Sequence, residues 1–280
     1  MTRTDASAHP VAPPMPATSS SVDGVDGVVA DDTVAAERDR RRQEVALGYR
    51  LLAALRWGDL GDGHITGRDP GRPDHFWLLT RGVPFGAATV DDLVLVGPDG
   101  AVVEGDGTVN ETAHRIHWPV HEARPTVIGA VHTHTPWGTP FCAERRLVRP
   151  ITQEACYFVD DVALFDDEEV QAIDLDCGRR IAAALGPARA VLLANHGLLT
   201  VGPSVGEAVA AFVLLERVCE AELKAPGAKP ISPGAARRAK AALEPERALA
   251  AAFTSLVAHH LGDPAVVRGG APATDRDGGL

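Results

Sequence analysis

Long apolar runs are missing from this sequence. No stretch of about 18 apolar residues occurs in the chain, so we expect no membrane-spanning helix. The first residues hold no apolar stretch of the kind that a secretory signal has, so we expect no such signal. No two cysteines form a C-x-x-C pair, and four in 280 residues are too few for a disulfide framework. Reduced thiols in a cytoplasm are the simplest interpretation for Cys142, Cys156, Cys177 and Cys219.

A surplus of basic residues is missing as well. The formal net charge is -11, and such a surface repels phosphate backbones, so we expect no nucleic-acid partner. What is present is the composition of an ordinary globular protein, with 45% hydrophobic and 23% charged residues. The length is ample for a buried core and predicts one large domain or two small ones.

The composition predicts an ordered central region between flexible ends. Residues 1–33 are rich in Pro, Ser, Ala and Asp, which predicts a disordered N-terminal arm. Residues 34–224 are expected to form the main domain. A linker and a C-terminal helix or helix pair are expected over 225–261, and a flexible tail over 262–280.

The main domain alternates helical and strand patterns. Asp32 or Thr33 can cap a first helix that runs to about Trp57. Short apolar runs separated by turn residues predict strands, and the turn at 97–100 predicts a hairpin. Hairpins with helices around them indicate an α/β fold with three layers, in which a mixed, mostly antiparallel central sheet lies between helices. Further helices are expected at 110–124, 175–185 and 204–224, and strands at 76–79, 93–96, 101–103, 127–134 and 190–194.

Three histidines carry the functional argument. His132 and His134 lie two residues apart on an expected strand, so their side chains point the same way and can hold one metal ion. His196 ends another buried strand, where active-site loops usually emerge. An H-x-H motif alone is more often a surface or hydrogen-bonded pair. The two motifs together favour a metal site, and three ligands leave the open positions of a catalytic one.

Four segments resemble the class II aldolase/adducin family: GDGHITGRDPGRPDHFWLL, RPTVIGAVHTHTPWGTPF, PITQEACYFVDD and AVLLANHGLLTVGPSVGEA. The likeness runs from about Glu44 to about Leu223. It implies the class II aldolase-like α/β/α fold, a homotetramer, and one divalent metal ion, Fe(II) or Zn(II), bound by His132, His134 and His196. It also implies substrate-binding roles for Gly63, His64, Gly82 and Gln153, and a supporting role beside the metal site for His117.

The chain departs from the family's sugar-phosphate aldolases at three places. Ala113 stands where these enzymes have a glutamate that shuttles protons, and we expect this position near the metal, in space that admits substrate or dioxygen. Glu111 and Thr112 replace a Ser-Ser pair that binds phosphate, and a carboxylate would repel phosphate. Gln153 replaces an assisting tyrosine. A phosphorylated sugar is therefore a poor candidate substrate.

These departures lead to a metal enzyme that cleaves a carbon–carbon bond next to a carbonyl. The chain resembles the iron oxygenase/decarboxylases of aminocoumarin antibiotic pathways, which implies oxidative decarboxylation of a small-molecule aromatic 2-oxo acid. Trp137 and Phe141 are candidate aromatic walls. Two alternatives stay open. One is a Zn-dependent aldolase or decarboxylase acting on an unphosphorylated hydroxy-carbonyl compound. The other is an adducin-like binding module without catalysis.

Overall fold

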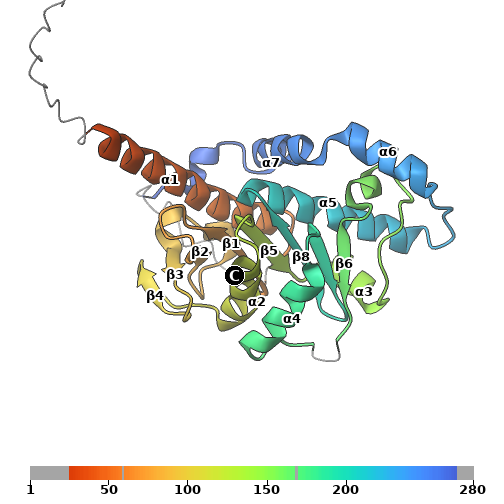
Figure 1. Cartoon of the computed structure of the whole chain (residues 1–280), viewed down its shortest axis with the longest axis horizontal. Helices are drawn as coiled ribbons and strands as arrows, with labels where there is room; N and C mark the ends of the chain where they lie inside the picture. Colours follow the sequence, from red (N-terminus) through yellow and green to blue (C-terminus); the bar gives the residue numbers. More distant parts are fainter. Residues whose placement is uncertain (1–24, 59, 168–169, 270–280) are drawn as a thin grey trace, which may run out of the picture.

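The computed structural model describes residues 25–58, 60–167 and 170–269 (Figure 1). Its centre is one sheet of eight strands in the order β4-β3-β2-β1-β5-β8-β7-β6. The strands are β1 (Gly63–Arg68), β2 (Phe76–Leu79), β3 (Leu93–Val96), β4 (Val102–Glu104), β5 (Gly129–Thr133), β6 (Val162–Phe165), β7 (Ala190–Leu193) and β8 (Gly197–Gly202). The helices are α1 (Val25–Ala54), α2 (Glu111–Ala123), α3 (Gly138–Ala143), α4 (Leu175–Leu185), α5 (Val205–Lys224), α6 (Pro233–Leu243) and α7 (Pro245–His260).

The sheet is mixed and mostly antiparallel, as predicted. Among the described strands only β6 and β7 pair in parallel, and α4 makes the crossover between them that a parallel pair requires. The predicted hairpin joins β3 to β4, and Gly100 in its turn has a φ of 80°, a conformation that favours glycine. β5 lies between β1 and β8, so its residues are covered on both edges.

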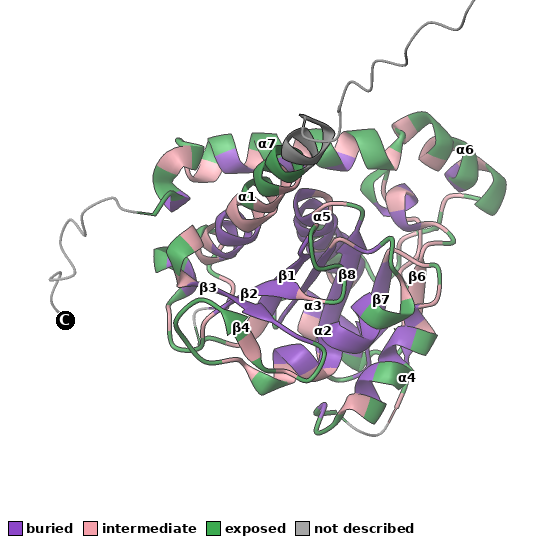
Figure 2. Cartoon of the chain, turned by 60° about the vertical axis from the view of Figure 1, so that its left-hand side comes forward, coloured by how far each residue is buried: buried purple, intermediate pink, exposed green. Residues whose placement is uncertain are grey.

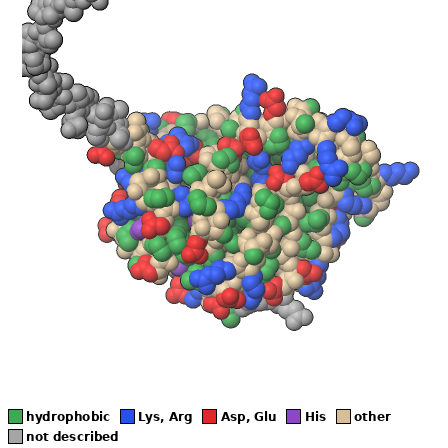
Figure 3. Space-filling model, in the orientation of Figure 1, with side chains coloured by type: hydrophobic (Ala, Val, Ile, Leu, Met, Phe, Trp, Pro, Cys, Tyr) green, Lys and Arg blue, Asp and Glu red, His purple; other side chains and the backbone are tan. Residues whose placement is uncertain are grey.

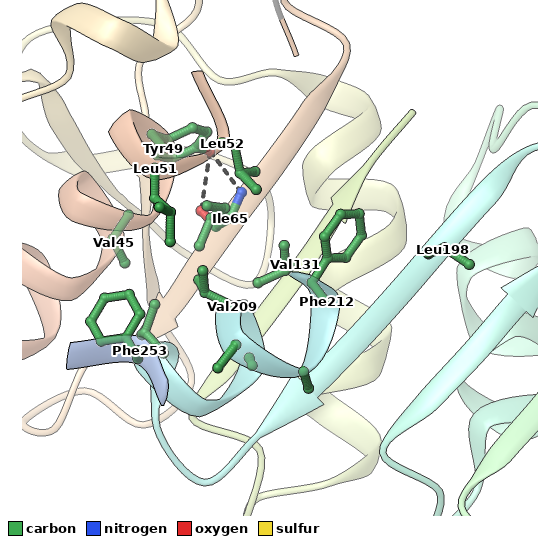
Figure 4. Packing of buried hydrophobic residues seen from close by; sticks show 14 of the residues in the cluster. Val45, Tyr49, Leu51, Leu52, Ile65, Val131, Leu198, Val209, Phe212 and Phe253 are labelled. Atoms are coloured by element: carbon green, nitrogen blue, oxygen red, sulfur yellow. Dashed lines mark hydrogen bonds between the residues drawn. The ribbon is translucent and has the colours of Figure 1, made fainter. Parts of the chain in front are cut away.

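Helices cover both faces of the sheet (Figure 2). Alternation along the strands sends Ile65 and Val131 into one cluster of buried apolar residues that includes residues of α1 and α5. Figure 4 shows part of this cluster, with the Tyr49 hydroxyl of α1 bonded to the backbone of Ile65. The opposite face carries Ala130 and packs against α2 and α4. The three-layer α/β/α prediction is therefore confirmed.

Side-chain caps explain why three helices begin where the sequence indicated. The Asn110 side chain accepts a hydrogen bond from the Thr112 backbone N–H at the start of α2. The Ser204 hydroxyl accepts one from the Glu207 N–H at the start of α5. Asp174 accepts from the Cys177 N–H at the start of α4. Each cap satisfies a backbone donor that a helix N-terminus leaves unpaired.

The ends of the chain correct two boundaries. Helix α1 begins at Val25, so residues 25–33 are helical and the expected cap at Asp32 or Thr33 is wrong; extending a helix adds a hydrogen bond per residue without a new nucleus. Pro264–Val267 form a short 3-10 turn that contacts α1 and buries Val267, so this part of the expected tail is ordered. The rest of the predicted arm, 1–24, and of the predicted tail, 270–280, lies outside the described residues.

The expected C-terminal helix is a pair, α6 and α7, with α7 against α5. In the part of the chain that the structure describes, no helix is long and apolar enough to cross a membrane. All four cysteines are buried free thiols, as expected from their spacing. On the face shown in Figure 3, basic and acidic side chains are interspersed rather than gathered into one-sign patches.

Candidate metal centre

His132 lies in the middle of the sheet, on β5. Its Cα pairs with that of His64 on β1 and with that of Leu199 on β8. The ring is buried, and its Nδ1 donates a hydrogen bond to the Leu198 carbonyl oxygen at 2.8 Å. Because a carbonyl only accepts, the proton is on Nδ1, and Nε2 keeps the lone pair that a metal ion needs.

His134 follows directly after the end of β5. Its Nδ1 lies 3.3 Å from a carboxylate oxygen of Asp62, in the loop that precedes β1. A carboxylate on one ring nitrogen orients a histidine so that its other nitrogen is free for a metal ion. Asp62 was not predicted as a site residue, although its place in the glycine-rich loop, two residues before His64, was a usable signal.

His196 is held by a tight turn. The antiparallel pair of Leu193 with Gly197 leaves three residues in the loop between β7 and β8. Asn195 at its centre has a φ of 57°, a left-handed conformation that asparagine adopts more readily than most residues. The backbone N–H of His196 closes the turn on the Leu193 carbonyl at 3.0 Å. The turn brings His196 beside the end of β5.

The three predicted ligands converge. One ligand nitrogen from each of His132, His134 and His196 lies within 4.8 Å of the other two, and the ring centroids are 4.8 to 5.4 Å apart. Nitrogens bound to one ion lie about 3–4 Å apart, so small ring rotations must bring the widest pair closer. Gly197 leaves room for this movement, since a Cβ there would lie 3.4 Å from the His132 ring and 3.5 Å from the His134 ring.

The electrostatics fit a divalent cation. Burial, followed by the nearby His196, holds the pKa of His132 well below its ordinary value. Burial, followed by His134, lowers the pKa of His196 to about 4. Both rings are therefore neutral at neutral pH, which is the form that binds metal ions. Among the described residues no other group of three such side chains meets, and three nitrogen donors leave open positions for substrate.

Two adjoining cavities open at this centre. The first, of about 400 Å³, contains the three histidines together with Asn110, Thr112 and Gln171. The second, of about 500 Å³, has walls from Tyr49, Leu79 and Phe85 and has Arg81 and Gly82 at its exposed rim. Both are lined by Gly61, Gly63, His64 and Asn110, so these residues form the junction between the cavities.

Gly63, His64 and Gly82, which we expected to bind substrate, line these cavities. Gly63 has a φ of 151°, and a Cβ there would collide with the Thr133 side chain and lie 2.7 Å from the His132 carbonyl oxygen. We refer to His132, His134 and His196 as the trio. His117 hydrogen-bonds to His64 rather than to a member of the trio, with its Nε2 2.8 Å from the Nδ1 of His64. His114 instead approaches the Pro98 carbonyl, so the described residues give no second metal site on α2.

The expectations for Ala113 and Glu111 are corrected. Ala113 is fully buried among apolar residues that include Phe76 and Leu78, and it is not among the described residues that line the two cavities. Its own side chain therefore does not line the space that we expected to admit substrate, although its neighbour Leu78 lines the second cavity. The Glu111 side chain is 74% exposed and pairs with Arg115 one turn along α2. Glu111 therefore cannot repel a phosphate from the cavity, and that argument against sugar phosphates fails.

Gln153 and the expected aromatic walls lie elsewhere. Gln153 is exposed and lines a separate groove between α5 and α7. Phe141 is buried in the main core, and Trp137 packs against that core with Lys224 over its ring. Tyr49 and Phe85 supply the aromatic walls instead, because α1 packs against the segment that contains Phe85.

Comparison with known proteins identifies the family. Residues 43–223 match the family described as Class II Aldolase and Adducin N-terminal domain, and the chain belongs to it. It is 40% identical over 199 residues to the protein named Decarboxylase NovR of Streptomyces niveus, covering 70% of this chain and 74% of that protein. It is 39% identical over 211 residues to a 4-hydroxy-3-prenylphenylpyruvate oxygenase/4-hydroxy-3-prenylbenzoate synthase of Streptomyces roseochromogenus, covering 74% of this chain and 76% of that protein.

A solved structure shows the same fold. The L-fuculose 1-phosphate aldolase from Glaciozyma antarctica superposes with a TM-score of 0.74 at 33% identity, covering 82% of this chain and 92% of that one. The class II aldolase-like fold prediction is thus confirmed. Since these relatives are named as enzymes and the chain shares their family, the chain is an enzyme.

Proposed function

We propose that this enzyme uses Fe(II), held by His132, His134 and His196, for oxidative decarboxylation of an aromatic 2-oxo acid of the prenylated 4-hydroxyphenylpyruvate type. The reaction would belong to antibiotic biosynthesis. The observation that carries the proposal is the trio itself, which lines one cavity that adjoins a second. A bound divalent ion polarises substrate oxygens as a Lewis acid, and iron adds access to dioxygen. The names of the two Streptomyces relatives support the substrate class.

The cavities match the two ends of such a substrate. The 2-oxo acid group suits the cavity of the trio, where three imidazole ligands would leave the charge of a divalent ion uncompensated by a ligand carboxylate. The aromatic ring and its prenyl chain suit the second cavity, whose volume of about 500 Å³ and walls of Tyr49, Leu79 and Phe85 favour an apolar body. Tyr49 is held in place because its hydroxyl bonds to both the N–H and the carbonyl of Ile65.

The test is metal analysis of protein purified without oxygen, followed by oxygen uptake and CO2 release with Fe(II)-loaded protein. Dioxygen is the oxidant and the carboxyl carbon leaves as CO2, so uptake and release should be equal. The substrates are 4-hydroxyphenylpyruvates with and without a prenyl group. Alanine at any trio position should abolish turnover while circular dichroism stays unchanged. Absence of oxygen uptake with every such acid would reject the proposal.

A second candidate is a Zn-dependent aldolase or decarboxylase acting on a hydroxy-carbonyl compound. The likeness to the fuculose phosphate aldolase supports it, and Arg81 at the rim offers a cation for an anionic substrate. Retro-aldol cleavage by Zn-loaded protein, with no oxygen uptake by the Fe(II) form, would establish this alternative.

We also propose a cytoplasmic homo-oligomer, most simply a tetramer. Gln153 lies on a different groove from the trio, so it can assist the reaction only at the site of another copy. Assembly through such contacts is the arrangement that the family resemblance implies. The proposed partner is a small-molecule substrate.

A further inference from the structure

A chain of buried hydrogen bonds connects the junction of the two cavities to the protein backbone. It begins at His64, whose Nδ1 lies 2.8 Å from the Nε2 of His117. The Nδ1 of His117 lies 2.7 Å from the Thr66 hydroxyl, which is 2.9 Å from the Nε2 of His121. The chain ends where the Nδ1 of His121 meets the Val127 carbonyl oxygen at 3.3 Å.

The Val127 carbonyl at the end of this series fixes the direction of every hydrogen bond in it. A carbonyl only accepts, so the Nδ1 of His121 carries a proton and its Nε2 accepts the Thr66 hydroxyl hydrogen. The Thr66 oxygen then accepts from the Nδ1–H of His117. The remaining lone pair of His117, on Nε2, accepts from the Nδ1–H of His64. The Nε2 of His64 is therefore left without a proton.

Burial keeps His117 and His121 in the neutral form that this direction requires. It holds the pKa of His117 well below the ordinary value and lowers the pKa of His121 to about 3. A second proton on His117 or His121 would set two donors against each other inside this chain of hydrogen bonds. The arrangement of protons thus follows from the hydrogen-bond partners.

The Nε2 of His64 faces the space that substrate would occupy. It has no hydrogen-bond partner among the described residues, and it is not one of the buried polar atoms sealed off without a partner. His64 is 2% exposed, and it lines both cavities. It does not belong to the group of ligand atoms within 4.8 Å of one another. Its lone pair is therefore available to a molecule lying across the junction.

We propose that His64 is a fixed hydrogen-bond acceptor for a donor group of the substrate, and that Thr66, His117 and His121 are positioning residues that hold its proton on Nδ1. This specificity rests on the proposed function only for the substrate class. An aromatic 2-oxo acid carries hydroxyl donors, as its enol or its phenol. A phosphate dianion has only acceptor oxygens, so the lone pair of His64 disfavours it. The acceptor thus selects against a phosphate group at the junction of the cavities.

The first arm of the test reads the proton position directly, without activity. In protein labelled with ¹⁵N at histidine, two-bond proton–nitrogen correlation spectra distinguish Nδ1–H from Nε2–H rings. We expect His64 and His117 as Nδ1–H in the metal-free and Zn(II)-loaded protein. Thr66→Val should disturb both signals by removing the hydroxyl, whereas Thr66→Ser should keep the wild-type pattern. A wild-type His64 in the Nε2–H form would overturn the proposal.

The second arm measures binding to folded, Zn(II)-loaded protein. Losing one hydrogen bond should weaken 4-hydroxyphenylpyruvate about tenfold in Thr66→Val and in His64→Phe, with Thr66→Ser near wild type. Zn(II) affinity should stay within about threefold in His64→Phe, whereas His132→Phe should lose it, as removal of a ligand requires. Equal loss of Zn(II) in both variants would make His64 a ligand and refute the assignment. If wild type binds no aromatic 2-oxo acid, the proposed function fails, and the proton positions still decide this inference.

Discussion

Replacing Asp62 by asparagine should weaken metal binding without unfolding the protein. The carboxylate lies 3.3 Å from the Nδ1 of His134, so it orients that ring and adds a negative charge near the cation. Removing such a partner typically costs 10–100-fold in metal affinity. The side chains are 41% exposed for His134 and 28% for Asp62, and water screens exposed pairs. We therefore expect the lower end, about tenfold or about 1.4 kcal/mol.

The chain contains a matched control. Asp74 makes the same kind of contact with the Nδ1 of His75, at 2.8 Å, but neither residue lines the cavities at the trio. Zn(II) affinity, measured by competition with a chromophoric chelator at fixed pH and ionic strength, should fall in Asp62→Asn and stay at the wild-type value in Asp74→Asn. Equal affinities in all proteins, or equal losses in both variants, would refute the role given to Asp62.

Four further outcomes are expected. Acid should destabilise the metal-free protein as pH falls from about 6.5 towards 3. Histidines of the unfolded chain take up protons near pH 6.5, whereas burial lowers the pKa of His121 to about 3 and holds that of His117 well below its ordinary value. The unfolded state therefore binds more protons than the folded state across this range, and acid favours it. Urea unfolding across this range should show a slope of up to about 1.4 kcal/mol per pH unit for each ring. Gly63→Ala should lower the melting temperature and abolish Zn(II) binding, because its Cβ collides with Thr133; binding at wild-type affinity would contradict this. Glu216→Ala should cost about 3 kcal/mol or more in urea unfolding, because it leaves one hydroxyl and two backbone N–H groups unpaired in the interior, and a loss below about 1 kcal/mol would count against it. Light scattering at micromolar concentration should give a tetramer for the full chain and for a variant lacking residues 1–24, and a monomer would exclude the assembly proposed above.

Local signals explain which parts of the fold and site the sequence could predict. Caps such as Asn110 and Ser204, and the turn with Gly100, act through neighbouring residues, so the elements they bound were recovered nearly to the residue. The pair His132 and His134 was recognisable because strand periodicity places both rings on one side.

The missed features depend on contacts between distant segments. Thr66 and His121 form a chain with His64 only because β1 lies beneath α2, which no local pattern reveals. Counting along the sequence placed Ala113 and Glu111 on α2, but it did not show which face of that helix packs against the sheet. Packing against β2 and β3 sets the rotation of α2 about its axis, which buries Ala113 and exposes Glu111.

The pairing of β1 with β5 has a consequence for how the enzyme can fail. His64 lies directly across from His132, and Thr66 across from Ala130. A slip of one residue would turn β1 over and move both its polar side chains to the apolar face of α1 and α5. A mispaired molecule would therefore lose its core and its catalytic centre together, leaving no folded but misregistered form with partial activity. Counting bound metal ions per chain therefore divides impaired variants into those that lower this number and those that lower the turnover of each occupied centre.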